Sequence, residues 1–345
     1  MRVVYLIERQ HEHHGRHVKP QPLAGAEAPL ALAISDWDGV HREQVALARR
    51  CAALAGEHGA RAAALLPWPS PAAGDNTPGA RLTTLEERIA RLELLGCFET
   101  LYIAPMPATP RESDVALEWL SELGDVRTLV GEPAPVGAIE WLWPAGLTAV
   151  AREAGIRVEQ GPWGKQPGGQ PGGQQGDLGA HIREMVVAGR MREATAALGY
   201  TYTVTGDVVG GDRRGRLLGF PTANLRLEPS KLTPKNGIYA GWVTLPGASV
   251  RWPAAVSIGV RPTFGDGLHQ QIEAHLLDVS MDLYGLRIQL EFVEYLRDEL
   301  RFEGLDALIQ QMERDREQSR AILRAEAPDH QDSRDEHASG MSRVE

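Results

Sequence analysis

The first half of the chain alternates short apolar runs with segments of helical hydrophobic spacing. Apolar runs that fit buried strands stand at 30–34, 61–66, 101–103 and 128–130. Apolar side chains recur every three or four residues over 42–55 and 84–95, as on one face of an amphipathic helix, and 115–120 continues the alternation. Strands and helices in this order predict an α/β domain, with a parallel sheet covered by helices.

After about residue 199 the hydrophobic period changes to strict alternation. Over 272–276, apolar side chains occupy one face of the predicted strand, and Glu273 and His275 occupy the other. Further strands are predicted at 200–209, 237–245 and 286–292. Apolar residues at helical spacing over 305–312 indicate one helix near the end. We therefore predict an antiparallel β-barrel with a C-terminal helix.

Composition narrows the classes of function. The chain has 345 residues, of which 43% are hydrophobic, and a formal net charge of −10, so we expect a soluble globular protein of two domains. The acidic balance argues against a nucleic-acid partner, because phosphate binding needs clustered Lys and Arg. No apolar run reaches the roughly 20 residues of a membrane span, and the apolar run near the N-terminus is too short for a signal peptide. We expect a cytoplasmic protein with no membrane partner.

Low-complexity segments suggest the domain boundaries. Residues 161–176 have the sequence GPWGKQPGGQPGGQQG, which is typical of a flexible tether. The polar, acidic residues 324–345 are expected to be a disordered tail. We expect an N-terminal domain over 1–199 that includes the tether, and a C-terminal domain over 200–323. The 2 cysteines make neither a disulfide framework nor a zinc site.

The segment richest in candidate chemistry spans residues 206–224, with the sequence GDVVGGDRRGRLLGFPTAN. Its glycines would let the backbone approach a polyphosphate, and its arginines would supply charge-assisted hydrogen bonds. Thr222 and Asn224 offer oxygen ligands on one face of an extended segment, which suits Mg²⁺. A glycine-rich turn with ordinary turn residues is the simpler alternative. Glu273 is either a proton acceptor or a surface residue of its strand.

Ordered motifs in the second half resemble those of a known family. After residues 206–225 come NGIYAG (236–241), SIGVRPTFG (257–265), IEAHLLD (272–278), DLYG (282–285) and LRDELRF (296–302). Together they closely resemble the riboflavin kinase domain of bacterial riboflavin-biosynthesis proteins, over roughly residues 200–323. The resemblance implies a Greek-key barrel that transfers the γ-phosphate of ATP to the ribityl 5′-hydroxyl of riboflavin, giving FMN and ADP.

The resemblance also implies roles for individual residues. It assigns ATP phosphate binding to Gly206, Gly211, Gly215 and Arg216, and Mg²⁺ binding to Thr222 and Asn224. Glu273 matches the family's catalytic base. Arg297 and Phe302 match residues on the flavin side of the site. The expected ligands are therefore riboflavin, FMN, ATP and ADP, with Mg²⁺ as the metal.

The first half resembles the FAD synthetase domain that bacterial relatives carry, a Rossmann-like nucleotidyltransferase. The similar segments are 33–44, 130–137 and 180–183. His41 remains, but the Gly-His pair that follows in the family is replaced by Glu43 and Gln44. Aromatic, serine and histidine positions of the motifs are also lost: the replacements are Pro133, Ala134, Val136, Leu178 and Gly179, and 65–69 contains no histidine. We expect a degenerate synthetase domain, with residual FMN adenylylation as the alternative.

Other interpretations account for less of the sequence. Asp36 and Asp38 after an apolar run mimic a haloacid-dehalogenase-type phosphatase motif, but no matching downstream acids and lysine precede residue 150. The four histidines of residues 11–17 lie in a segment without cysteine, so solvated side chains are favoured over a metal site. A flavin-responsive binding protein would not require the Thr222, Asn224 and Glu273 set.

Overall fold

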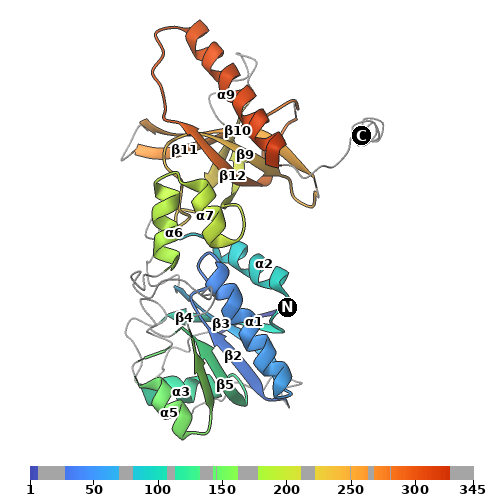
Figure 1. Ribbon diagram of the computed structural model, residues 1–345, viewed down its shortest axis with the longest axis vertical. Helices are drawn as coiled ribbons and strands as arrows, with labels where there is room; N and C mark the ends of the chain where they lie inside the picture. Colours follow the sequence, from blue (N-terminus) through green and yellow to red (C-terminus); the bar gives the residue numbers. More distant parts are fainter. Residues whose placement is uncertain are drawn as a thin grey trace. The chain divides into compact units, whose positions relative to one another are not determined.

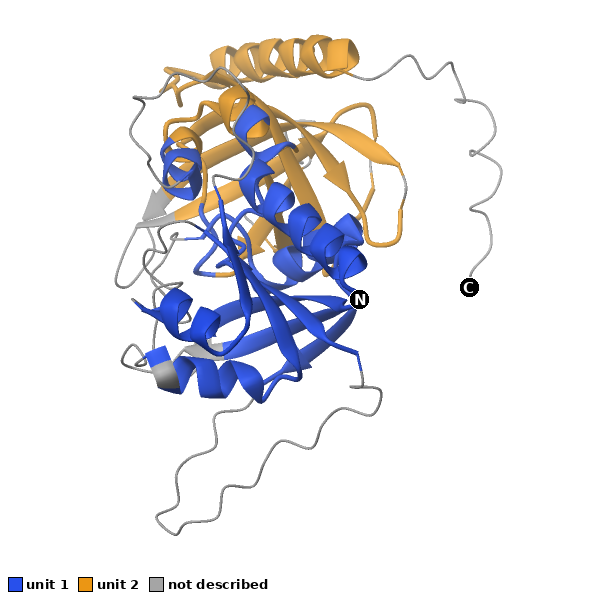
Figure 2. Cartoon of the chain, turned by 60° about the horizontal axis from the view of Figure 1, so that its bottom comes forward, with its two compact units in different colours: residues 1–184, 196–199, 229–232 blue, residues 185–195, 200–228, 233–345 orange. Residues whose placement is uncertain are grey.

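The computed structural model consists of two compact units, coloured separately in Figure 2. Unit 1 comprises residues 1–184, 196–199 and 229–232, and unit 2 the rest of the chain. The structure describes residues 1–6, 28–69, 81–106, 113–132, 143–144, 146–161, 178–210, 222–248, 250–262, 268–279 and 281–326. Most of the predicted tether and tail lies outside these residues. Within the described part, no helix is both long and apolar enough to span a membrane.

Unit 1 contains a six-stranded parallel sheet. Its strands are β1 (Arg2–Tyr5), β2 (Leu30–Ile34), β3 (Arg61–Pro69), β4 (Thr100–Met106), β5 (Val126–Gly131) and β6 (Arg157–Gln160), in the order β1-β4-β3-β2-β5-β6. The chain runs outward from β2 to β4 and then returns to the other side of β2. This reversal between β2 and β5 is the topological switch point at which doubly wound sheets bind ligands.

Helices cover both faces of the sheet, as Figure 1 shows. The helices α1 (Arg42–Glu57) and α2 (Leu85–Leu95) pack on one face, and α3 (Ser113–Ser121) and α5 (Leu147–Glu153) on the other. Thr84 caps α2 in a reciprocal pair with Glu87, and Gly96 ends it in the left-handed conformation. Local sequence signals therefore determine both ends of α2, and the predicted α/β fold is confirmed.

Unit 2 is built on a closed six-stranded antiparallel barrel. Its strands are β7 (Thr203–Val209), β8 (Ala223–Leu227), β9 (Gly237–Thr244), β10 (Arg251–Pro262), β11 (Leu268–Leu276) and β12 (Arg287–Arg297). Consecutive strands β9, β10 and β11 pair in turn, and β12 returns to lie beside β9. This is Greek-key topology, so the predicted barrel class is confirmed.

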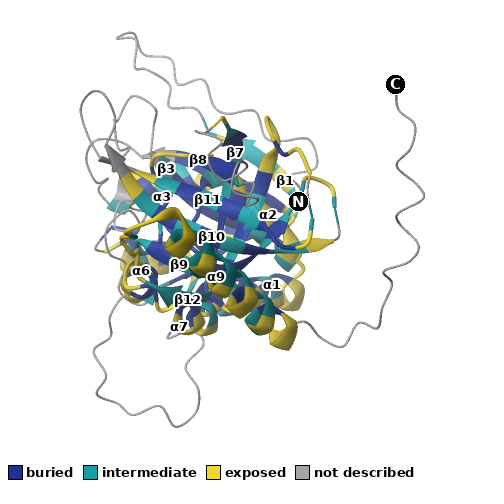
Figure 3. Cartoon of the chain, turned by 90° about the horizontal axis from the view of Figure 1, so that it is seen from above, coloured by how far each residue is buried: buried dark blue, intermediate teal, exposed yellow. Residues whose placement is uncertain are grey.

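The barrel interior is filled by alternating apolar side chains. Figure 3 colours the strands by how far each residue is buried. Tyr239 and Phe292 meet edge to face with ring centroids 5.2 Å apart. Outside the barrel, Leu323 of α9 (Leu305–Glu326) packs with Ala240 and Val293. Two short helices, α6 (Leu178–Val187) and α7 (Met191–Leu198), precede the first strand of the barrel.

The C-terminal helix differs from its prediction in two respects. It continues to Glu326, three residues into the segment predicted to be a disordered tail over 324–345, where Glu326 forms an ion pair with Arg192 at 2.9 Å. Leu305, predicted to lie on the apolar stripe, is 55% exposed. The buried positions of the helix are Asp315, Ser319 and Leu323, and Asp315 is accommodated there because Arg297 of β12 binds its carboxylate.

Candidate active site

Three polar residues form one row across the barrel: two of them, Asn224 and Glu273, were predicted site residues, and the third is Ser257. Asn224 of β8 pairs directly with Glu273 of β11, which in turn pairs with Ser257 of β10. Directly opposed residues of an antiparallel pair point to the same face, with Cβ atoms about 5 Å apart. The structure therefore brings together Glu273 and Asn224, which stand 49 residues apart in the sequence numbering.

This row lies on the outer face of the barrel. The neighbouring positions Ala223, Ala274 and Val256 are completely or almost completely buried and point into the barrel core. Side chains alternate between the two faces of a strand, so the row points outward. Asn224 is nevertheless buried, whereas Glu273 is partly exposed. Because Glu273 is partly exposed, a substrate hydroxyl can reach its carboxylate, as a general base requires.

Two uncharged groups with oxygen atoms that can bind a metal, the Thr222 hydroxyl and the Asn224 amide, lie beside the Glu273 carboxylate. Thr222 immediately precedes β8, two residues before Asn224, whose Oδ1 accepts a hydrogen bond from Nε2 of Gln271. A hydroxyl and an amide oxygen fit Mg²⁺ that keeps waters or phosphate oxygens as its other ligands. Among the described residues, no cluster of three or more His, Cys, Asp or Glu side chains could hold a metal without such help.

The predicted phosphate-binding residues are only partly described. Gly211, Gly215 and Arg216 lie outside the described residues. Gly206 lies within β7, where it pairs with both β8 and β12. An added Cβ there would stand 2.8 Å from the carbonyl oxygen of Arg226 and from Leu227 Cδ2. Close packing of the strands explains this glycine, and its predicted contact with phosphate stays a prediction.

A partly buried ion pair holds the predicted flavin-side arginine. Nε of Arg297 lies 2.8 Å from Oδ1 of Asp315, and Nη2 lies 2.5 Å from Oδ2. Its Nη1 donates to the carbonyl oxygen of Asp298 at 2.8 Å. The guanidinium therefore ties the end of β12 to α9. Phe302 follows in the next segment and is partly exposed, and neither residue's predicted contact with flavin is tested by these positions.

The segment after β12 is held by a second polar cluster. Oδ1 of Asp298 lies 2.8 Å from Lys235 Nζ and accepts a hydrogen bond of 2.6 Å from the Tyr295 hydroxyl. The hydrogen bond from Lys235 is the main cause that lowers the pKa of the Asp298 carboxyl. The same contact with Asp298 raises the pKa of the Lys235 ammonium. This exposed ion pair links the start of residues 298–302 to the residues that precede β9.

In unit 1, the protein's own polar side chains occupy the switch point. Ser35, after β2, donates to Glu132, after β5, at 2.8 Å. Nε2 of Gln44 donates to Ser35 at 3.1 Å and to Asp36 at 2.8 Å, while its Oε1 accepts from the backbone N–H of His41 at 3.2 Å. The side-chain amide of Gln44 thus supplies hydrogen-bond partners both to the loop after β2 and to the N-terminal end of α1. Glu43 adds a carboxylate in the first turn of that helix.

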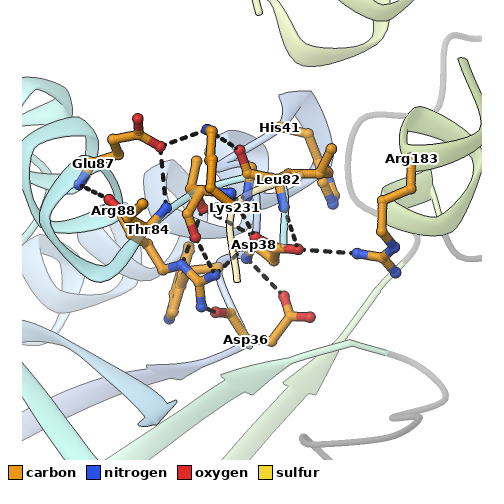
Figure 4. Close-up of polar contacts among 12 residues, drawn as sticks. Asp36, Asp38, His41, Leu82, Thr84, Glu87, Arg88, Arg183 and Lys231 are labelled. Carbon is orange, nitrogen blue, oxygen red and sulfur yellow. Dashed lines mark hydrogen bonds and ion pairs between the residues drawn. The ribbon is translucent and has the colours of Figure 1, made fainter. Parts of the chain in front are cut away.

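A buried aspartate organises the loop between β2 and α1, drawn in Figure 4. Asp38 accepts hydrogen bonds from Arg88 at 2.7 Å, from Arg183 at 3.0 Å and from the backbone N–H groups of Leu82 and Thr83. Burial by itself raises the pKa of Asp38, but Arg88, the two amides and Arg183 together outweigh it and hold the pKa below its ordinary value. Asp38 is therefore a structural anion within unit 1.

A lysine from the connection between β8 and β9 completes this network. Lys231 belongs to unit 1, where its Nζ lies 2.6 Å from Oε2 of Glu87 and 2.5 Å from the carbonyl oxygen of Leu82 (Figure 4). Burial lowers the pKa of Lys231, and Glu87 opposes that shift. Sequence reasoning missed this residue, because nothing near it in the chain indicates a buried partner.

Comparisons with known proteins found related sequences over most of the chain. Residues 198–323 match the family model described as riboflavin kinase. The chain is 30% identical over 300 residues to a bifunctional riboflavin kinase/FMN adenylyltransferase from Listeria monocytogenes, covering 85% of this chain and 92% of the relative. It is 32% identical over 307 residues to the protein of the same description from Escherichia coli K12, covering 82% of this chain and 90% of the relative.

A solved structure shares the fold over nearly the whole chain. It is a Streptococcus pneumoniae protein described as a macrolide-efflux protein, with a TM-score of 0.72 and 20% identity. The match covers 93% of this chain and 99% of that one. At that identity the likeness shows a common two-part architecture and nothing of activity.

Proposed function

The chain belongs to the family of bacterial bifunctional riboflavin kinase/FMN adenylyltransferases, and from this premise we propose that its barrel transfers the γ-phosphate of ATP to riboflavin. The observation that carries the proposal is the direct pairing of Glu273 with Asn224. That pairing brings a carboxylate beside the oxygen donors that would accompany the nucleotide. The products are FMN and ADP.

In the proposed reaction, Glu273 accepts the proton of the ribityl 5′-hydroxyl. The oxygen of that hydroxyl forms a bond to the γ-phosphorus as the bond from that phosphorus to the β,γ-bridging oxygen breaks, and ADP leaves with the bond's electrons. Phosphoryl transfer depends mainly on positioning and on stabilising charge on the transferring group. Rigid strands on both sides of Glu273 support this positioning, because β8 and β10 hold it from either edge.

Thr222 and Asn224 would hold the Mg²⁺ that accompanies ATP. Bound there, the metal would neutralise charge on the phosphate oxygens. To bind the metal, Oδ1 of Asn224 would either lose its hydrogen bond from Gln271 or accept that hydrogen bond and bind the metal at the same time. Glycines of the connection between β7 and β8 would contribute backbone N–H groups to the phosphates, as the family resemblance implies, and Gly211, Gly215 and Arg216 belong to that connection.

Purified protein incubated with riboflavin and MgATP tests the proposal, with the flavins separated by chromatography. We expect FMN to accumulate in an amount equal to the ADP formed, and we expect no FMN when Mg²⁺ is removed with EDTA. Absence of FMN from folded protein under these conditions would reject the kinase assignment. A sample without ATP controls for flavin carried through purification.

FMN adenylylation is the second candidate function. The relatives named bifunctional match most of the chain, including unit 1. Against it stand Gln44, which is fully engaged with Ser35, Asp36 and His41, and the Glu43 carboxylate, which would repel phosphates at the start of α1. We therefore propose that unit 1 has lost this activity.

The same chromatographic assay with FMN and MgATP separates the two candidates. We expect no FAD, because the carboxylate of Glu43 stands where the ATP phosphates would approach. FAD at a rate comparable to FMN formation would overturn the proposed loss. The E. coli relative, which carries the bifunctional description, serves as the positive control.

A further inference from the structure

The carboxylate of Glu299 lies against the backbone of Gly259 in β10. An added Cβ at Gly259 would overlap Oε1 of Glu299, so a larger residue would displace the carboxylate from this point of the strand. Gly259 is extended and its φ is not in the left-handed region, so backbone conformation does not require the glycine. The glycine instead leaves space above its Cα, and the Glu299 carboxylate occupies that space.

This contact places Glu299 on the same face of the barrel as Glu273. Gly259 pairs with Gln271 and stands two residues from Ser257, the partner of Glu273. Residues two apart on a strand share a face, and diagonal neighbours lie about 7–8 Å apart. A substrate that contacts Glu273 can therefore extend to Glu299 along the strands.

The two neighbours of Glu273 along this face differ in chemistry. Thr222 immediately precedes β8, and the direction of the pairing puts it toward His275. Gly259 lies on the other side, toward Gln271. In phosphoryl transfer the attacking and leaving oxygens stand roughly in line on opposite sides of the phosphorus. With the nucleotide on the Thr222 side, the acceptor alcohol comes from the Gly259 side.

Fixed residues deliver Glu299 to this side. The side chain of Arg297 is bound by the buried Asp315. The carbonyl oxygen of Arg297 lies 2.5 Å from where a Cβ of Gly237 would stand. Asp298 is bound by Lys235 and Tyr295. Arg297 anchors the segment and Asp298 adds an exposed ion pair, so the exposed side chain of Glu299 reaches β10 from a short stem that begins at a fixed residue.

We propose that Glu299 is a substrate-binding residue that accepts hydrogen bonds from the hydroxyls of the acceptor's ribityl chain. The proposal rests on the kinase function proposed above and assigns its acceptor side. An ionised carboxylate only accepts hydrogen bonds, so it suits a polyol and repels phosphate groups. Arg297 then acts as a positioning residue for the segment.

The test is Glu299→Gln in the full-length protein, measured by steady-state kinetics. We expect the KM for riboflavin to rise about tenfold, the effect of losing one charge-assisted hydrogen bond. The KM for ATP and the Mg²⁺ concentration for half-maximal rate stay unchanged. Gly259→Ala keeps the carboxylate but displaces it, so it raises the same KM by a smaller factor. Glu303→Gln, an exposed glutamate of the same segment, is the matched control.

A binding titration separates failure of this inference from failure of the kinase function. Quenching of flavin fluorescence reports riboflavin binding without turnover, and lumiflavin carries the ring system without the polyol. We expect Glu299→Gln to weaken riboflavin binding and leave lumiflavin binding unchanged. Unchanged riboflavin binding would overturn the role of Glu299, as would a shift confined to the Mg²⁺ requirement. Riboflavin binding without FMN formation by the wild-type protein would reject the kinase function alone.

Discussion

Replacing Glu273 by alanine is expected to lower the turnover of FMN formation at least about 100-fold, the low end of general-base contributions. The reason is that the ribityl hydroxyl then loses its proton acceptor, while the Thr222 and Asn224 donors remain. ATP binding should stay unchanged, because in the proposed reaction Glu273 contacts the transferring group only through the acceptor. Single-turnover rates and an ATP-binding titration measure the two quantities separately.

A second barrel glutamate provides the control for this result. Glu291 of β12 is also partly buried on a strand and binds Arg251 at 3.1 Å. It lies away from the Asn224–Glu273–Ser257 row, so Glu291→Ala should leave turnover within about twofold of the wild type, the scale of a surface substitution. Near wild-type turnover in the Glu273 variant would remove that residue from the role of base.

Replacing Asp38 by alanine is expected to destabilise unit 1 by about 3–5 kcal/mol, because it leaves the buried guanidinium of Arg88 without its carboxylate partner. Arg88 is only 3% exposed and has Asp38 as its carboxylate partner at 2.7 Å. Removing the anion also takes away the acceptor for the backbone N–H groups of Leu82 and Thr83. Urea unfolding, with hydrogen exchange in β2 and β3 as the local probe, measures the loss.

Two further variants keep this prediction decisive if the alanine variant does not fold. Arg183→Gln removes the partly exposed partner of Asp38, so its effect should be smaller. Asp125→Asn breaks the exposed pair with Arg127 and should change stability by less than about 0.5 kcal/mol. Equal effects of Asp38→Ala and Asp125→Asn would contradict a structural role for the buried network.

The depressed pKa of Asp38 also predicts an acid limit for unit 1. A carboxyl whose pKa is lower in the folded state stabilises the fold above its unfolded pKa of about 3.9. This contribution is lost as the pH falls through the lower folded pKa. Unfolding free energy measured from pH 6 downward should therefore decrease less steeply in Asp38→Asn than in the wild type. Parallel profiles would argue against the shift.

Local patterns predicted most of the fold, because hydrophobic period and caps act within a few residues. The strands β2 and β3 and the helices α1 and α2 fall where the apolar spacing put them. The strand β1 was missed, since its residues 2–5 are partly exposed and include Arg2. Burial of Asp315 and Ser319 in α9 was missed for the opposite reason: polar side chains carry no hydrophobic signal.

The candidate site depends on register, which the sequence alone does not contain. Motif order indicated Thr222, Asn224 and Glu273, but only the pairing of β8 with β11 shows that Asn224 and Glu273 are neighbours. Gly259 and Glu299 stand 40 positions apart in the numbering, and no spacing rule connects them. The engagement of Gln44 with Ser35 and Asp36 likewise follows from the folded loop rather than from residue types.

The membership of residues 229–232 in unit 1 has a consequence for how this protein can be divided. A fragment that begins at residue 200 keeps Lys231 but discards Glu87 and Leu82, the groups that bind its ammonium. A fragment that ends at residue 199 keeps Glu87 and Leu82 but lacks the Lys231 ammonium that binds to them. No single cut in the chain therefore yields both halves intact, so unit 1 would be retained with the barrel even if, as proposed, it has lost its own activity.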